Sequence, residues 1–201
     1  VILTGAIGGI NITSSNPVVT FTPGAVSAAQ TTISLSLASV TANGTSTSTL
    51  TVQAKDAQGN NLTISGGTVT LADDSATAVL SPVTDNNNGT YTATISNTVA
   101  EDVVISSTIA NNSISSGDPI ISFIPGAVSA ADTSISVSPT SVTADGTSTA
   151  TISVQAKDVL GNNLTSSGGT VTLAENSATA VLSPVTDNND GSYTATISNT
   201  I

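Results

Sequence analysis

The chain repeats itself: residues 1–99 and 103–201 are two copies of one sequence, offset by 102 positions without a gap. The segment 21–25, Phe-Thr-Pro-Gly-Ala, returns at 123–127 as Phe-Ile-Pro-Gly-Ala. A solenoid unit runs roughly 20–50 residues, so this period instead matches a small domain that buries its own core. The repeat therefore predicts folded domains joined end to end, an arrangement typical of modular spacers.

Composition excludes several classes of function. The chain has no Cys, Met, Trp or His, which removes thiol and imidazole chemistry and the usual zinc, copper and haem ligands. Thirteen of the 15 charged residues are acidic and the net charge is −11. Nucleic acids and anionic membranes attract basic patches, and no run of 18 apolar residues is present, so we expect neither partner. We also expect no enzyme activity and no cofactor.

Apolar and polar residues alternate with period two, which predicts β-strands. Strands are expected at 32–37, 46–54, around 62–64, and at 68–71, 78–80, 91–95, 103–109 and 119–123. Gly- and Asn-rich turns separate them at intervals of about 8–12 residues, the spacing of an immunoglobulin-like sandwich. The predicted fold class is all-β, with tandem immunoglobulin-like β-sandwich domains. Tyr91 and Tyr193 sit where such a fold carries a tyrosine corner.

Three segments carry a resemblance to a known family. Residues 141–164 (Ser-Val-Thr-Ala-Asp-Gly through Asp-Val-Leu-Gly-Asn-Asn-Leu) resemble the opening of bacterial Ig-like domains of the invasin and intimin type. Residues 189–197 resemble the later turn and strand of those domains, and 123–127 resemble the last strand and the linker. The resemblance implies an extracellular module in the rigid stalk of a bacterial surface adhesin.

The phase of the repeat divides the chain unequally. With the boundary at Pro-Gly-Ala, residues 1–25 form the last two strands of a preceding Ig-like repeat, 26–127 form a complete domain, and 128–201 form a domain lacking its last two strands. Two interpretations follow. The chain is a window of a longer repeat protein, or neighbouring copies complete one another head to tail and form a filament.

The Asx-rich turns at 85–89 and 187–191 offer the oxygen ligands that Ca²⁺ prefers. The calcium candidates are Asp85, Asn87, Asp187, Asn189 and Asp190. The acidic twelfth position of an EF-hand is missing, and the first turn keeps one Asp, so a hairpin turn without metal is the favoured interpretation. No other metal site and no catalytic residue is predicted.

The predicted function is therefore structural: a stalk or spacer repeat of a cell-surface adhesin or filament, whose partners are neighbouring repeats of the same protein. The first alternative is an Ig-like binding module that contacts a glycan or a protein through a sandwich face. The second is an accessory module of a secreted enzyme. Exposed aromatic clusters would favour binding, and the chain has only four aromatic residues.

Overall fold

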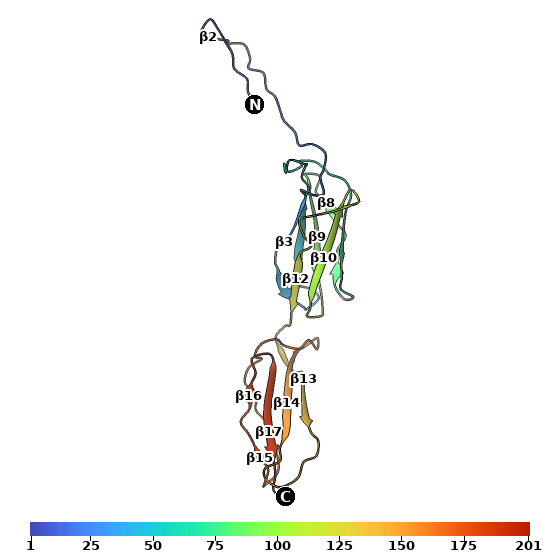
Figure 1. The fold of residues 1–201 in the computed structure, drawn as a ribbon, viewed down its shortest axis with the longest axis vertical. Coiled ribbons are helices and arrows are strands. Elements are labelled where there is room, and N and C mark those ends of the chain that lie inside the picture. The colour runs from blue at the N-terminus through green and yellow to red at the C-terminus, as the bar shows by residue number, and fades with distance from the viewer.

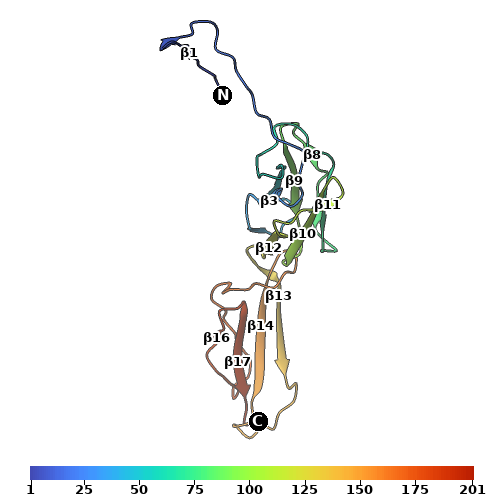
Figure 2. The same ribbon diagram turned by 45° about the horizontal axis from the view of Figure 1, so that its top comes forward.

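The computed structural model describes residues 1–201 and is built almost entirely of strands and turns. Two sandwich-like bodies follow one another along the long axis, and an extended arm projects beyond the first (Figure 1). We call residues 1–24 the hairpin arm, residues 26–127 the middle sandwich and residues 128–201 the second sandwich. The 45° view shows the arm leaving the middle sandwich and folding back on itself (Figure 2).

The middle sandwich has two sheets. The first has the order β3-β5-β9-β7, with β8 also paired to β9, and the second has the order β11-β10-β12-β4, with β6 also paired to β10. Their bounds are β3 Thr32–Leu35, β4 Ser39–Thr41, β5 Ser48–Gln53, β6 Val69–Asp73, β7 Val79–Leu80, β8 Thr84–Asp85, β9 Thr90–Ser96, β10 Asp102–Ile109, β11 Asn112–Ser113 and β12 Ile120–Ile124. Alternate residues of β5 and β9 are buried, as expected for strands with one face on a core.

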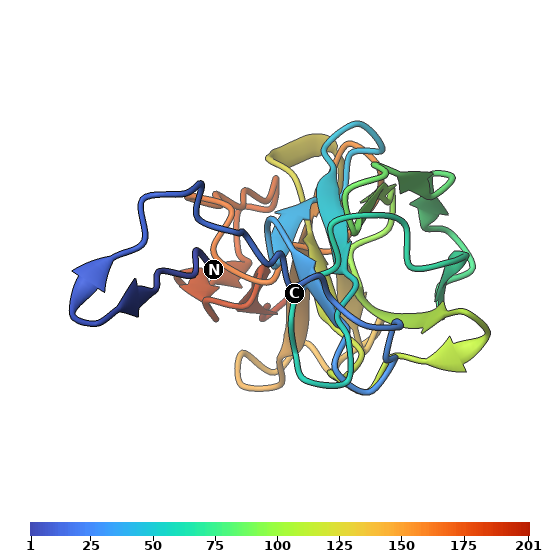
Figure 3. The same ribbon diagram turned by 90° about the horizontal axis from the view of Figure 1, so that it is seen from above.

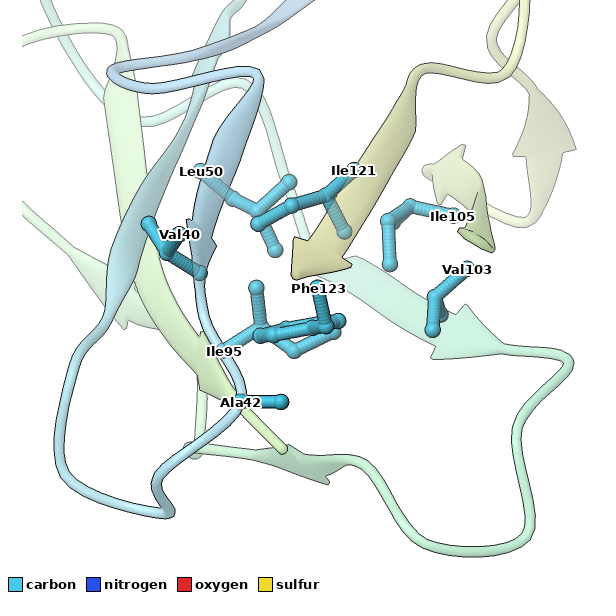
Figure 4. Close-up of a cluster of buried hydrophobic side chains, with 8 residues drawn as sticks. All are labelled: Val40, Ala42, Leu50, Ile95, Val103, Ile105, Ile121 and Phe123. Carbon is cyan, nitrogen blue, oxygen red and sulfur yellow. The ribbon is translucent and has the colours of Figure 1, made fainter. Parts of the chain in front are cut away.

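The strands β10 and β12 close the middle sandwich. β10 pairs antiparallel with β6, and β12 pairs parallel with β4 through Phe123 opposite Val40. Their side chains complete a cluster of eight buried residues. Figure 4 shows Ile121 and Phe123 from β12, and Val103 and Ile105 from β10, packed against residues of the opposite sheet.

The second sandwich consists of one sheet, β13-β14-β17-β15, with β16 also paired to β17. Its strands are β13 Val128–Ser138, β14 Ala150–Asp158, β15 Val181–Leu182, β16 Thr186–Asp187 and β17 Ser192–Ser198. The sequence counterparts of β4 and β6, at 141–143 and 171–175, form no ladder here. The counterparts of the eight-residue cluster, at 142, 144, 152 and 197, are not buried here. A second cluster of seven buried residues in the middle sandwich is reduced to Val154, Ala156, Leu164 and Tyr193.

The arm contains a hairpin whose two strands pair with no strand of the middle sandwich. β1 (Ala6–Ile7) and β2 (Ile10–Asn11) pair antiparallel with each other, and an isolated bridge joins Ile2 to Val18. Seen from above, the arm reaches sideways past the stacked sandwiches (Figure 3).

The all-β, Ig-like fold class predicted from the sequence is confirmed, and several local predictions need correction. The strand expected around 62–64 is a single bridge between Lys55 and Asn61. The turn at Gly89 packs directly against this segment. Gly89 has a φ of +84° and lies so close to the Leu62 carbonyl that a Cβ at residue 89 would clash with it. The short strands β4, β8 and β11 were not expected.

The tyrosine corner takes a different form from the one expected. The Tyr91 hydroxyl accepts a hydrogen bond from the Gly66 amide at 2.7 Å and donates one to the Gly67 carbonyl at 2.8 Å. In antibody domains the hydroxyl bonds the backbone only a few residues upstream, whereas here the partners lie 24 and 25 residues before Tyr91. Tyr193 repeats the contact with Gly168 at 2.7 Å, so the bond ties the same loop to the core in both sandwiches.

Replacing Phe123 should test the closing strands. Phe123 is 3% exposed, whereas its repeat counterpart Phe21 is 79% exposed. We expect Phe123→Ala to lower the free energy of unfolding by about 3–5 kcal/mol, the usual cost of deleting a buried phenyl ring. Phe21→Ala is the matched control and should leave urea unfolding in dilute solution unchanged. Equal effects of the two substitutions would contradict the assignment of Phe123 to the core.

Candidate functional site: the domain junction and two unpartnered surfaces

The two sandwiches meet at a short connection whose geometry is set by Asp158. β12 ends at Ile124, and β13 begins at Val128. The Gly126 amide between them donates a hydrogen bond to Asp158 Oδ2 at 2.9 Å. Asp158 is 2% exposed and lies at the end of β14, so the linker is fastened to a buried carboxylate of the sandwich that follows it.

The side chain of Asn162 connects the second sandwich to the middle sandwich by hydrogen bonds. Its side-chain nitrogen donates to Asp158 Oδ2 at 2.9 Å and to the Thr98 carbonyl at 3.0 Å, and its Oδ1 accepts from the Ala100 amide at 2.9 Å. One amide thus joins the loop after β9 in the middle sandwich to the loop after β14 in the second. We call Asp158, Asn162 and Gly126 the junction bracket.

The same bracket exists at the other end of the middle sandwich without a neighbour. The Gly24 amide donates to Asp56 Oδ2 at 2.9 Å, and the Asn60 side chain donates to the same oxygen at 3.0 Å. Asn60 contacts no residue of another sandwich. The Asn60 side-chain nitrogen also donates to Asp56 Oδ1 at 3.2 Å, whereas the Asn162 side chain bonds Thr98 and Ala100 of the preceding sandwich.

Hydrogen bonds keep both bracket carboxyls ionised. The side-chain hydrogen bond from Asn60, followed by the Gly24 amide, lowers the pKa of Asp56 to about 2 from the ordinary value of 3.8. For Asp158, burial opposes the charged form, but hydrogen bonds from Gly126 and Asn162 outweigh it and the pKa is lowered. Each carboxylate therefore acts as a fixed acceptor for its linker at neutral pH.

Glu101 lies at the same junction end of the middle sandwich and is one of the three residues without a repeat copy. Its Oε1 accepts from Ser75 Oγ at 2.5 Å, Asn97 Nδ2 at 2.8 Å and Thr77 Oγ1 at 3.1 Å. These bonds lower its pKa. Glu101 thereby gives a hydrogen-bond partner to the side chain of Asn97, which is 1% exposed and lies in the loop whose Thr98 and Ala100 bind Asn162.

The calcium candidates lie in two hairpin turns and bind their own backbone. Asp85 Oδ1 accepts from the Asn87 amide at 2.8 Å, and Asp187 Oδ1 accepts from the Asn189 amide at 2.8 Å. Asp190 Oδ1 accepts from the amide and hydroxyl of Ser192. Asn87 and Asn189 have positive φ values of 58° and 60°. No group of three or more acidic, His or Cys side chains is arranged to hold a metal ion.

Calcium removal tests the turns directly. Because each of these carboxylates already accepts hydrogen bonds within its own turn, we expect the melting temperature to be the same in excess Ca²⁺ and in EDTA. A rise of several degrees with Ca²⁺, lost in the Asp187→Asn variant, would show that the turns do bind the ion.

Acid titration tests the bracket. A carboxyl with a lowered folded-state pKa stabilises the fold above its unfolded pKa and loses that contribution as the pH falls through the folded pKa. We therefore expect the free energy of unfolding to drop between about pH 4 and pH 2, and Asp56→Asn to flatten this drop. Asp118→Asn is the control, since Asp118 accepts no hydrogen bond. If both variants show the parent's pH dependence, Asp56 has no such role.

Two surfaces are left without a partner. On the arm, the apolar side chains of one face are exposed, including Phe21 at 79% and Ile7 at 76%. On the second sandwich, a groove of about 330 Å³ opens between the counterparts of β4 and β6, with Val142 and Ile197 in its wall. No helix in the structure has the length and apolarity needed to cross a membrane.

Sequence reasoning located some of these features and missed others. The sequence analysis placed domain boundaries at the Pro-Gly-Ala linkers. The three side-chain hydrogen bonds of Glu101 were not anticipated. The bracket was missed. Its signal is the spacing of an Asp four residues before an Asn directly after a strand, which occurs at 56 and 60 and again at 158 and 162.

Comparison with known proteins identifies the relatives. The invasin crystal structure, described as a bacterial integrin-binding protein, is 25% identical with a TM-score of 0.63, covering 100% of this chain and 40% of that one. InvD of Yersinia pseudotuberculosis is 29% identical with a TM-score of 0.63, covering 85% of this chain and 49% of that one. FdeC, an Escherichia coli adhesin, is 20% identical with a TM-score of 0.57, covering 98% and 64%, and shows the fold alone.

The chain therefore spans between about two fifths and two thirds of these relatives. A search of curated protein sequences gives no match. A family model described as invasin, domain 3, matches residues 27–126 and again 129–200, which is nearly the whole chain. The expected resemblance to bacterial adhesin modules of the cell surface is confirmed, and the chain belongs to the invasin domain 3 family.

Proposed function

We propose that this chain is a stalk segment of a bacterial surface adhesin, in which tandem sandwiches hold a distant binding region away from the cell. The observation that carries the proposal is the junction bracket. A linker of three residues between β12 and β13 leaves little slack, and Asn162 bonds the loop of the preceding sandwich at both of its polar atoms. Such a joint favours one relative orientation of the two bodies.

The repeat of the bracket supports propagation along a row of domains. Asp56 and Gly24 already adopt the geometry of Asp158 and Gly126, each with a bond of 2.9 Å. A sandwich that preceded the middle one could therefore form the same hydrogen bonds with Asn60 that the middle sandwich forms with Asn162. The partners proposed for this segment are accordingly neighbouring repeats, and residues 1–25 are the closing strands of the repeat that precedes residue 26.

A binding module for a glycan or a protein is the competing function. Sugar and protein contacts of this kind rely on exposed aromatic side chains. Tyr91, Tyr193 and Phe123 are at most 3% exposed, and Phe21 lies on the arm, in the register of a core residue. No sandwich face therefore offers an aromatic platform, which favours the spacer.

Removing the Asn162 amide tests the stiffness of the joint. The chain has no Cys, so spin labels can be placed uniquely at Ser34→Cys and Ser136→Cys, two exposed and equivalent positions of the two sandwiches. We expect one narrow distance distribution in the parent and a clearly broader one in Asn162→Ala, because the bonds to Thr98 and Ala100 are lost.

Asn60→Ala is the matched control for this experiment. It removes the same bond to the bracket carboxylate but no contact between sandwiches, so the distribution should stay narrow. A parent distribution as broad as that of Asn162→Ala would contradict a rigid stalk.

A further inference from the structure

The turn between β8 and β9 of the middle sandwich holds an asparagine folded back on its own backbone. Asn88 Oδ1 accepts hydrogen bonds from the Thr90 amide at 3.0 Å and from Thr90 Oγ1 at 2.6 Å. A bond from a side chain to the amide two residues further on wraps the carboxamide around the intervening peptide, here the one between Asn88 and Gly89. Asn88 is also exposed, so solvent reaches its side chain.

An asparagine that precedes a glycine can lose its side-chain amide to water without an enzyme. The glycine nitrogen gives up its proton and attacks the asparagine Cγ, so that a bond from nitrogen to Cγ forms. The bond from Cγ to Nδ2 then breaks, and the departing group takes up a proton and leaves as ammonia. Water opens the resulting succinimide ring at one of its two carbonyls and gives aspartate or isoaspartate. Glycine favours the attack because it has no Cβ to crowd the nitrogen.

The surroundings of Asn88 favour each part of this reaction. The Gly89 amide donates no hydrogen bond to the protein, so its nitrogen attacks without breaking one. The two Thr90 donors polarise the Cγ carbonyl and stabilise the negative charge that develops on Oδ1 during the attack. Asn88 Nδ2 has no hydrogen-bond partner in the turn, so its departure as ammonia costs no contact.

Asn43 and Gly44 form the other Asn-Gly pair of the chain, and there the reacting groups are held. Asn43 Oδ1 also accepts from two amides, those of Thr45 at 2.9 Å and Ser46 at 2.7 Å. However, the Gly44 amide donates to the Asn97 carbonyl at 2.9 Å, and Asn43 Nδ2 donates to Ser46 Oγ at 3.0 Å. Both of these bonds must break before ammonia leaves, so the folded structure protects Asn43.

The second sandwich shows that the same turn accepts the aspartate product. The counterpart of Asn88 is Asp190, whose Oδ1 accepts from the Ser192 amide at 2.9 Å and from Ser192 Oγ at 2.6 Å. These bonds from the Ser192 hydroxyl and amide lower the pKa of Asp190, which keeps the carboxylate ionised at neutral pH. Gly191 has a φ of 84°, as Gly89 does. Conversion of Asn88 to aspartate therefore leaves the hydrogen bonds and the backbone of the turn in place.

We propose that Asn88 is a self-modification site, at which spontaneous deamidation by water converts the turn of the middle sandwich into the aspartate form that the second sandwich carries. Both products add one negative charge to the chain. They differ in fit, because isoaspartate inserts an extra backbone atom directly before Gly89, whose position against the Leu62 carbonyl leaves no room even for a Cβ. Aspartate at position 88 therefore keeps the stability of the sandwich, and isoaspartate lowers it.

Peptide mapping by mass spectrometry, followed over time in mildly alkaline buffer, tests the proposal. Both pairs read Asn-Gly-Thr, so Asn88 and Asn43 should convert at equal rates when the chain is unfolded in urea. In the folded protein we expect Asn88 to convert at least about tenfold faster than Asn43, because two hydrogen bonds hold the reacting groups at Asn43. Asn86 and Asn87 lie in the same turn without a following glycine and should keep their amides.

Two variants separate the effect of the turn from the reactivity of the Asn-Gly pair itself. Thr90→Val removes one of the two donors to Oδ1, so it should slow conversion of Asn88 severalfold in the folded protein and leave the rate in urea unchanged. Asn88→Asp should unfold at the same urea concentration as the parent, because Asp190 makes the equivalent bonds. The isoaspartate fraction of the converted parent, isolated by chromatography, should unfold at a lower urea concentration.

Equal rates at Asn88 and Asn43 in the folded protein, or conversion of Asn88 in urea alone, would overturn the proposal. A Thr90→Val variant that converts as fast as the parent or faster would show that the Thr90 hydroxyl does not assist the attack, contrary to the role given to it. Clear destabilisation by Asn88→Asp would contradict the fit of the aspartate product. None of these outcomes bears on the joint between the sandwiches, so the stalk is tested separately.

Discussion

The pairing of β10 with β6 and of β12 with β4 is the interaction on which the rest of the structure depends. Where both pairs exist, in the middle sandwich, eight residues form a buried cluster and Phe123 is 3% exposed. Where they do not, in the second sandwich, the counterpart segments form no strand, the eight-residue cluster is absent, and a second cluster of seven buried residues falls to four. Apolar burial and the satisfaction of two sheet edges therefore come from the same pair of strands.

The strand β12 also connects the core of the middle sandwich to the position of the sandwich that follows it. β12 runs directly into Pro125 and Gly126, and Gly126 bonds Asp158 of the next sandwich. The strand that closes one core thus fixes the start of its neighbour, and Asn162 adds a second connection through Thr98 and Ala100. In the stalk that we propose, a row of such domains would gain stiffness from the elements that stabilise each domain, without a large charged or aromatic interface.

Much of this could be predicted from the sequence, for clear physical reasons. Period-two alternation located β5 and β9 because one face of each strand is buried along its whole length. The repeat offset predicted strands in the arm, where β1 pairs with β2. Short strands such as β4 and β11 were missed because pairing, rather than their own two or three side chains, defines them. The strand expected near Leu62 failed because the Gly89 turn packs on its carbonyl. Asn162 was missed because it carries no hydrophobic signal, and only its spacing from Asp158 could have identified it.

Hydrogen exchange of backbone amides in dilute solution measures the closing pair most directly. The residues of β6 and their counterparts at 171–175 are nearly identical in type. The two segments differ in whether a strand equivalent to β10 pairs with them. The account predicts that the amides of Thr70 and Ala72, which face β10, are strongly protected, while those of Thr172 and Ala174 exchange at nearly the rate of an unstructured chain. Equal protection of the two segments would show that the sandwich closes without β10 and β12, and would contradict the central claim.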